Sequence, residues 1–178
     1  GIGTPRVLLN SACARFPDGL ANRSGLVGTN LMFHPYGLVT GIFPDALEGY
    51  KGPTGCCIIS QEFYETDRSR GFARGYSFEM IRGMGPVATA LFAMSTGRAP
   101  WGAAHHDAYA GIWDRTAGMV AICEDLPEEC NRVTLDPVLV DSSGIPAPKI
   151  DYRLGENSQR VLAHAVARVE RADADPQL

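Results

Sequence analysis

Short apolar runs alternate with turn residues along the chain, and the spacing within the runs changes between strand-like and helix-like periods. Runs rich in β-branched and aromatic residues predict strands, which lie at 38–43, 55–60 and 119–123. Apolar residues at helical spacing predict helices, which lie at 4–14, 87–94 and 103–115. In the last helix, Tyr109, Ile112 and Trp113 are the candidate core contacts. Twenty glycines and twelve prolines predict many connecting turns.

The C-terminal third predicts a hairpin followed by a helix. Residues 131–136 and 149–154 alternate as strands do, and 141–144 (Asp-Ser-Ser-Gly) supply turn chemistry between them. Ser158 then has the side chain of a helix N-cap. The apolar residues that follow it at helical spacing are Val161, Leu162, Ala165, Val166 and Val169.

Residues 71–81 alternate bulky with small or polar groups, which predicts a strand. The residues of one parity are Phe72, Arg74, Tyr76, Phe78 and Met80. Two interpretations remain open. Arg74, Tyr76 and Phe78 form the wall of a substrate site, since such sites combine apolar surface with a few polar groups. Alternatively, the strand is half-buried in an ordinary sheet with Arg74 at its edge.

The N-terminal helix carries a start signal. Thr4 has an N-cap side chain, Pro5 stands where a first helical residue would, and an apolar stretch begins at Val7. The N-terminus of a helix presents unpaired backbone N–H groups, which can bind an anion.

Composition predicts a globular protein with a core, since 45% of the residues are hydrophobic and 20% charged. A net charge of −4 without Lys and Arg clusters argues against a nucleic-acid partner. No apolar run reaches the length of a membrane span. Five cysteines, an odd number without repeated spacing, argue against a disulfide framework and favour reduced thiols.

Other candidate chemistry has a simpler interpretation beside it. His105 and His106 next to Asp107 suggest a metal site, but adjacent helical residues point about 100° apart, so a solvated helix start is favoured and no metal is expected. The acidic cluster at 124–129 offers a general acid and base pair or, more simply, a solvated connection. Hydrolase, P-loop and zinc-protease motifs do not occur.

Three segments together resemble one family. They are the Gly-Thr-Pro helix start at 3–5, the Gly-x-Asn-Leu-x-x-His-Pro run at 28–35, and the run from 124 through 137 with Asp-Ser-Ser-Gly-Ile-Pro-Ala-Pro after it. This combination resembles the glucose-methanol-choline (GMC) oxidoreductases, which use FAD to oxidise alcohols and sugars. The amino-acid sequence of the third segment is similar to the sequences of the gluconate and fructose dehydrogenase branch.

The resemblance implies a fold and a set of contacts. It implies an α+β chain, with a largely antiparallel substrate-domain sheet covered by helices and an N-terminal helix that belongs to the FAD-binding domain. Residues 1–35 would form part of the FAD-binding region, and 36–178 the substrate region and the start of the C-terminal region. The residues implied to lie near FAD are Gly3, Thr4, Pro5, Asn30 and His34. His34 either hydrogen-bonds near the flavin or serves a purely structural turn with Pro35.

The chain also departs from the family pattern. Ala12 follows Ser11 where the family has glycine, and Gly1 and Gly3 are not followed by the remaining glycine of the ADP-binding fingerprint. The proton-accepting histidine of the family is expected outside this chain, which therefore resembles the middle of a longer enzyme. The expected partners are an alcohol, sugar or sugar-acid substrate, and the remainder of the enzyme or a second copy. The alternatives are a non-catalytic binding domain and an inactive truncated fragment, and a cytoplasmic or periplasmic location stays open.

Overall fold

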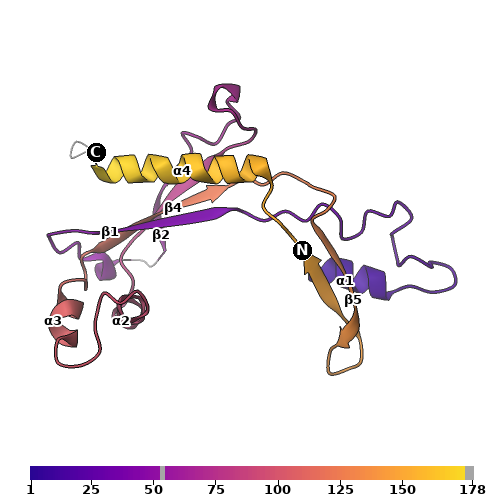
Figure 1. The fold of residues 1–178 in the computed structure, drawn as a ribbon, viewed down its shortest axis with the longest axis horizontal. Helices are drawn as coiled ribbons and strands as arrows, with labels where there is room; N and C mark the ends of the chain where they lie inside the picture. The colour runs from indigo at the N-terminus through magenta and orange to yellow at the C-terminus, as the bar shows by residue number, and fades with distance from the viewer. Residues whose placement is uncertain (53–54, 175–178) are drawn as a thin grey trace. The chain divides into compact units, whose positions relative to one another are not determined.

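The computed structural model describes residues 1–52 and 55–174, and the chain forms two compact units. The hairpin unit comprises Gly1–His34 and Asp125–Ser158, and the sheet unit comprises Pro35–Glu124 with the chain from Gln159 onward. The expected division into a FAD-binding region at 1–35 and a substrate region at 36–178 stays a prediction. Figure 1 shows the elements of both units.

The hairpin unit consists of one helix and one antiparallel hairpin. Helix α1 spans Gly3–Asn10, and the hairpin is formed by β5 (Arg132–Val140) and β6 (Pro146–Asp151). Arg6 fixes α1 to the hairpin, because its Nε donates to the Pro146 carbonyl at 2.8 Å and a terminal nitrogen donates to the Asp141 carboxylate at 2.7 Å. The Arg6 bond and the turn amides hold the pKa of Asp141 below its usual value.

Helix α1 is shorter than expected and begins earlier. Ile2 already has helical backbone angles (φ −68°, ψ −38°), and no side chain caps the helix, so the prediction that Thr4 is the N-cap is wrong. The helix ends at Asn10 instead of residue 14. The carbonyl of Leu8, which residue 12 would bond in a longer helix, accepts instead from Leu20 N at 2.8 Å.

The sheet unit is built on a four-stranded antiparallel sheet in the order β1-β4-β3-β2. Its strands are β1 (Tyr36–Ile42), β2 (Cys56–Ser60), β3 (Tyr76–Ile81) and β4 (Thr116–Cys123). Its helices are α2 (Pro86–Ser95), α3 (His105–Ala110) and most of α4 (Glu156–Ala174), with 3-10 turns η1 (Gly49–Lys51) and η2 (Arg68–Arg70). In Figure 1, α4 lies on one side of the sheet, and α2 and α3 lie on the other.

The core of the sheet unit lies between the sheet and α4. Tyr76 and Cys123 face each other across β3 and β4, and both are buried together with Val161 and Ala165 of α4. The helical spacing predicted for α4 is thus confirmed. Gly37 permits the close approach of the helix, because a Cβ there would lie 3.0 Å from the Val166 side chain. Burial raises the pKa of Cys123 to about 11.

The predicted bounds of β3 and α3 are also wrong. Strand β3 begins at Tyr76 instead of residue 71, since Arg74 takes a left-handed conformation (φ +69°) and its N–H donates to Thr66 Oγ1 at 3.0 Å. Arg74 is exposed in a loop and does not share a strand face with Tyr76 and Phe78. Helix α3 is only six residues long, although Ile112 beyond it is buried against Ala93 and Ala99 as expected.

Helix α4 begins at Glu156, so Ser158 is not its N-cap. Ser158 is buried in the first turn, and its hydroxyl donates to Asp125 Oδ1 at 2.6 Å. The hydroxyl therefore serves a tertiary contact instead of the helix end. The fold class, α+β with antiparallel sheets and helices, is confirmed. Among the described residues, none of the helices has both the length and the apolar character that a membrane span requires.

The imidazole of His164 is a titratable group that lies beside this core. His164 Nδ1 is 2.9 Å from the Tyr76 hydroxyl, and the rings of Phe63 and Phe72 pack against the imidazole. Burial lowers the pKa of His164, and the nearby guanidinium groups of Arg168, Arg70 and Arg171 lower it further. The folded protein therefore binds fewer protons than the unfolded chain as the pH falls below about 6.5, and the free energy of unfolding decreases there.

We expect the urea midpoint of the wild type to fall more steeply between about pH 7.5 and pH 5.5 than that of His164→Gln, which lacks the titrating group. His106→Gln, at an exposed histidine of α3, is the matched control and should keep the wild-type slope. Asp67, Asp136 and Asp141 have lowered pKa values and titrate below this window. Equal slopes in all three proteins would contradict the assignment of this pH dependence to His164.

Candidate functional site

The segment at 28–35 meets the hairpin at Gly28. The Val133 N–H donates to the Gly28 carbonyl at 2.7 Å, and Gly28 has a left-handed backbone conformation (φ +85°). A Cβ at this position would lie 2.1 Å from the Val133 carbonyl oxygen and 3.6 Å from the Cβ of Pro5. Only glycine fits here, and it brings the loop, α1 and β5 together.

Asn30 follows in a second left-handed position (φ +57°), and its side-chain amide donates to Thr29 Oγ1 at 3.2 Å. The next amide, Leu31 N–H, donates to the Asn131 carbonyl at 2.8 Å. Asparagine tolerates this conformation better than most residues, which accounts for its presence in such a turn.

Asn131 is itself a fixed point of the hairpin unit. It is 1% exposed, its Nδ2 donates to the Arg153 carbonyl at 3.0 Å, and its Oδ1 accepts from the Arg153 N–H at 2.9 Å. The side chain thus pairs with a backbone as a neighbouring strand would. It fixes the start of β5 to the chain beyond β6 while its carbonyl holds Leu31.

Asp125 holds the same segment from the other end. Its Oδ2 accepts from Phe33 N–H at 3.3 Å and from the Tyr152 hydroxyl at 2.8 Å. Its Oδ1 accepts from Leu126 N–H at 3.0 Å and from the Ser158 hydroxyl. All four partners donate to the carboxylate, so each of its oxygens accepts two hydrogen bonds.

Tyr152 connects this carboxylate to an aromatic contact. Its ring meets the ring of Phe33 edge-on, with centroids 4.8 Å apart. Burial, together with the hydrogen bond to Asp125, raises the pKa of Tyr152 to about 12, so the phenol is neutral at physiological pH. His34, directly after Phe33, is exposed.

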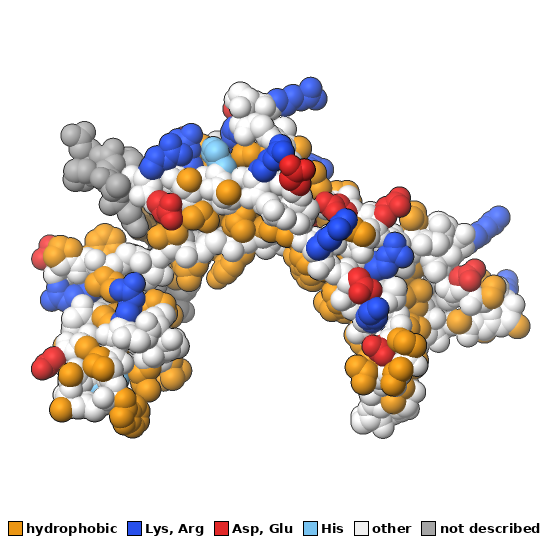
Figure 2. Space-filling model, viewed as in Figure 1, with side chains coloured by type: hydrophobic (Ala, Val, Ile, Leu, Met, Phe, Trp, Pro, Cys, Tyr) orange, Lys and Arg blue, Asp and Glu red, His pale blue; other side chains and the backbone are white. Residues whose placement is uncertain are grey.

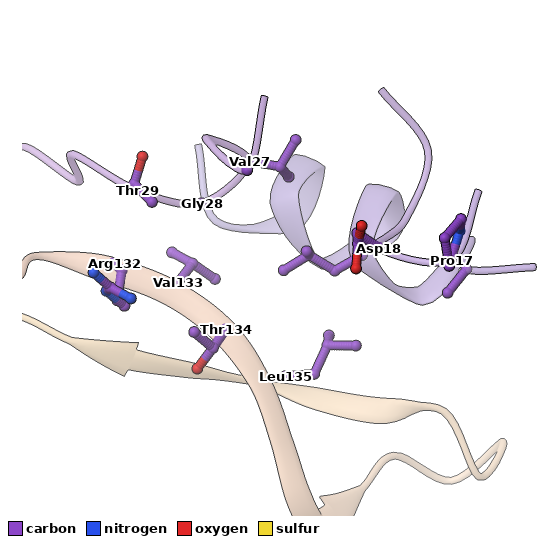
Figure 3. A pocket seen from close by; sticks show the side chains of 12 residues that line it. Pro17, Asp18, Val27, Gly28, Thr29, Arg132, Val133, Thr134 and Leu135 are labelled. Atoms are coloured by element: carbon purple, nitrogen blue, oxygen red, sulfur yellow. The ribbon is translucent and has the colours of Figure 1, made fainter. Parts of the chain in front are cut away.

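A cavity of about 350 Å³ lies within the hairpin unit beside Gly28. Figure 3 shows Val27 and Thr29 of the loop on one side and Arg132, Thr134 and Leu135 of β5 on the other. Asp18 and Pro17 lie at the end toward α1. The lining combines apolar side chains with hydroxyls, one guanidinium and one carboxylate, which is a composition typical of small-molecule sites.

The structure places the predicted cofactor residues around this loop. Gly3 and Thr4 are exposed in the first turn of α1, and Pro5 lies near Gly28. Asn30 and His34 belong to the loop segment itself. Pro5 and the loop are thus brought together, as the two sequence motifs suggested. Contact between any of these residues and a cofactor stays a prediction.

The sheet unit has its own pocket, of about 240 Å³, on the face of the sheet opposite α4. It is lined by strand residues and by the chain after β3, namely Tyr36, Leu38, Thr40, Ile81, Arg82, Gly83, Met84, Thr116, Ala117 and Gly118. Leu38 is 49% exposed on this face. Figure 2 shows hydrophobic side chains on the side of the sheet away from α4.

The predicted substrate residues lie elsewhere in the sheet unit. Tyr76 is 1% exposed and Phe78 packs against it with ring centroids 5.1 Å apart, on the face that α4 covers. This geometry matches the half-buried sheet that was the alternative interpretation. Substrate contact by Arg74, Tyr76 and Phe78 remains untested, and the burial of Tyr76 argues against it.

The residues that join distant segments carry no local sequence signal. The interpretation of the acidic cluster as a solvated connection is wrong for Asp125, which is half-buried and accepts four hydrogen bonds. Three of its donors lie 27, 33 and 92 residues away, so no local pattern marks it. The described residues contain no group of three or more His, Cys, Asp and Glu placed to hold a metal ion.

Comparison with known proteins finds relatives among dehydrogenases. The chain is 40% identical over 173 residues to 2-methyl-1,2-propanediol dehydrogenase of Mycolicibacterium austroafricanum, an alignment that covers 97% of this chain and 31% of that protein. It is 31% identical over 166 residues to the fructose dehydrogenase large subunit of Gluconobacter japonicus, covering 92% of this chain and 29% of that protein. The chain therefore spans less than a third of these relatives. No protein-family model matches it.

The close approach at Gly28 gives a stability prediction. Gly28→Ala should lower the free energy of unfolding by about 1–3 kcal/mol more than Gly25→Ala, because the added methyl collides with the Val133 carbonyl. Gly25 is the matched control, since it also has a positive φ (+71°) but nothing within 4 Å of a Cβ. Urea unfolding of both variants measures the difference. Equal losses would show that left-handed strain alone matters at Gly28.

Proposed function

We propose that this chain is part of an FAD-dependent oxidoreductase of the GMC type that oxidises the CH–OH group of an alcohol or sugar. The observation that carries the proposal is the 40% identity, over nearly the whole chain, to a protein named as a dehydrogenase of a small diol. A second relative is named as a subunit of a sugar dehydrogenase. The motifs at 3–5 and 28–35 support the same family.

The residues of the hairpin unit fit such a cofactor. The N-terminus of α1 has no side-chain cap, so its first amides remain available to an anionic group. Gly3 is exposed, and a Cβ there would meet nothing within 4 Å, which leaves room for a close approach. In this proposal Gly3, Thr4, Pro5, Asn30 and His34 hold FAD, and residues 1–35 belong to the cofactor region. When bound, FAD supplies the acceptor for a hydride.

The sheet unit then supplies the substrate wall, within the region 36–178. We place the substrate at the pocket lined by Leu38, Thr40 and Met84, because the other face of the sheet is covered by α4. The pocket would orient the reacting C–H bond and exclude water from it. Its lining is mostly apolar, with a few hydroxyls and the side chain of Arg82, which suits an alcohol that has an apolar part and few hydroxyl groups.

Flavin binding tests the part of the proposal that assigns FAD to the hairpin unit. The full-length enzyme that contains this chain is purified, incubated with excess FAD and desalted, and its visible absorption spectrum is recorded. We expect retained flavin in the wild type and a weaker FAD affinity in Asn30→Ala and His34→Ala. His106→Ala, which removes an exposed histidine of the sheet unit, should bind FAD as the wild type does. A colourless wild type would contradict the proposal and favour a non-catalytic binding domain.

Substrate specificity tests whether the substrate binds at the pocket of the sheet unit. Leu38→Ala enlarges the pocket, so the ratio of kcat/KM for a bulkier alcohol to that for a short one should rise, by about tenfold. The assay uses the full-length enzyme that contains this chain, with an artificial electron acceptor. Leu91→Ala makes the same change at an exposed leucine of α2 (62% exposed) outside the pocket and should leave the ratio unchanged. Equal effects of the two variants, or none, would place the substrate elsewhere.

A further inference from the structure

Asp125 is surrounded by four groups that donate hydrogen bonds to its carboxylate. The N–H groups of Phe33 and Leu126 donate to different oxygens of the carboxylate, at 3.3 and 3.0 Å. The hydroxyls of Tyr152 and Ser158 add one donor to each oxygen, at 2.8 and 2.6 Å. Each oxygen therefore accepts one backbone and one hydroxyl hydrogen bond. An asparagine of the same shape would turn its NH₂ group toward one of these pairs of donors.

Three of the four donors come from stretches of chain that are far from Asp125 in sequence. Phe33 immediately precedes His34, Tyr152 follows β6, and Ser158 lies in the first turn of α4. One half-buried carboxylate thus joins the loop segment to the end of the hairpin and to the helix start. Charge-assisted bonds of this kind are stronger than neutral ones, and a half-buried position strengthens them further.

The loop segment is held at two alternate residues. Leu31 N–H donates to the Asn131 carbonyl at 2.8 Å, and Phe33 N–H donates to Asp125. The Phe33 ring is also fixed against Tyr152. Asn30 and His34 therefore flank a stretch whose backbone is fixed at both ends, and the second fixed point depends on Asp125.

We propose that Asp125 is a positioning residue, which fixes residues 30–34 so that Asn30 and His34 reach the cofactor in one arrangement. This inference rests on the proposed function, because Asn30 and His34 are its cofactor residues. Asp125 itself acts only through Phe33, Tyr152 and Ser158. The acidic cluster at 124–129 then contributes an anchor for the site, in place of an acid and base pair.

Asp125→Asn tests the proposal, since it keeps the shape and replaces one oxygen, which accepts two of the four hydrogen bonds, by an NH₂ group. Asp136→Asn is the matched control, because Asp136 is also a carboxylate of the hairpin unit and accepts from the amides of Val138 and Leu139. Backbone hydrogen exchange of the peptide that contains Phe33 reports the anchor without any cofactor. In the full-length enzyme that contains this chain, the visible circular dichroism of bound FAD and the separate kcat and KM values report the positioning.

In Asp125→Asn we expect faster exchange at Phe33, an altered flavin circular dichroism signal, and a kcat reduced by about tenfold to a hundredfold with KM within about twofold. Asp136→Asn should leave all three unchanged. Faster exchange at Phe33 with normal flavin signal and kcat would overturn the positioning role while the proposed function stands. A wild type without flavin would refute the proposed function itself, whatever exchange shows for Asp125. Unchanged exchange at Phe33 in Asp125→Asn would show that Asp125 does not fix the backbone of Phe33.

Discussion

The burial of one face of the four-stranded sheet under α4 is the constraint on which the sheet unit depends. Because strand residues alternate between faces, the pairing of Tyr76 with Cys123 commits every second residue of β3 and β4 to the helix. Gly37 on β1 completes this surface by leaving space for Val166 and Leu162. The remaining residues are thereby committed to the opposite face, and this places Leu38, Thr40 and Gly118 around a pocket.

In the hairpin unit, polar side chains take the place of a large apolar core. Arg6, Asn131 and Asp125 each join stretches of chain that are far apart in sequence, and most of their partners are backbone groups. Such contacts are directional, so they fix geometry as well as contributing stability. A unit that is held in this way can present the half-buried Asn30 and the exposed His34 in a defined arrangement.

The sequence predicted what depends on local patterns. The apolar spacing of Val161, Ala165 and Val169 in α4 and the turn residues between β5 and β6 led to the correct elements, and the α+β class is confirmed. Local patterns were insufficient where tertiary contacts decided the outcome. Thr4 and Ser158 have capping side chains, yet the first lies inside a helix that Ile2 already begins, and the second bonds a carboxylate 33 residues away. The alternation at 71–81 could not reveal that Arg74 turns left-handed.

Cys123 lies at the centre of the sheet unit, and its thiol is wholly buried, whereas the thiols of Cys13 and Cys130 are exposed. Since the thiolate is the reactive form, a buried thiol with a pKa of about 11 is protected both by access and by protonation. Modification of Cys123 by an alkylating reagent therefore has to wait for α4 to move away from the sheet. The rate at which Cys123 is alkylated therefore reports how often α4 moves away from the sheet. The exposed thiols of Cys13 and Cys130 give the reference rate.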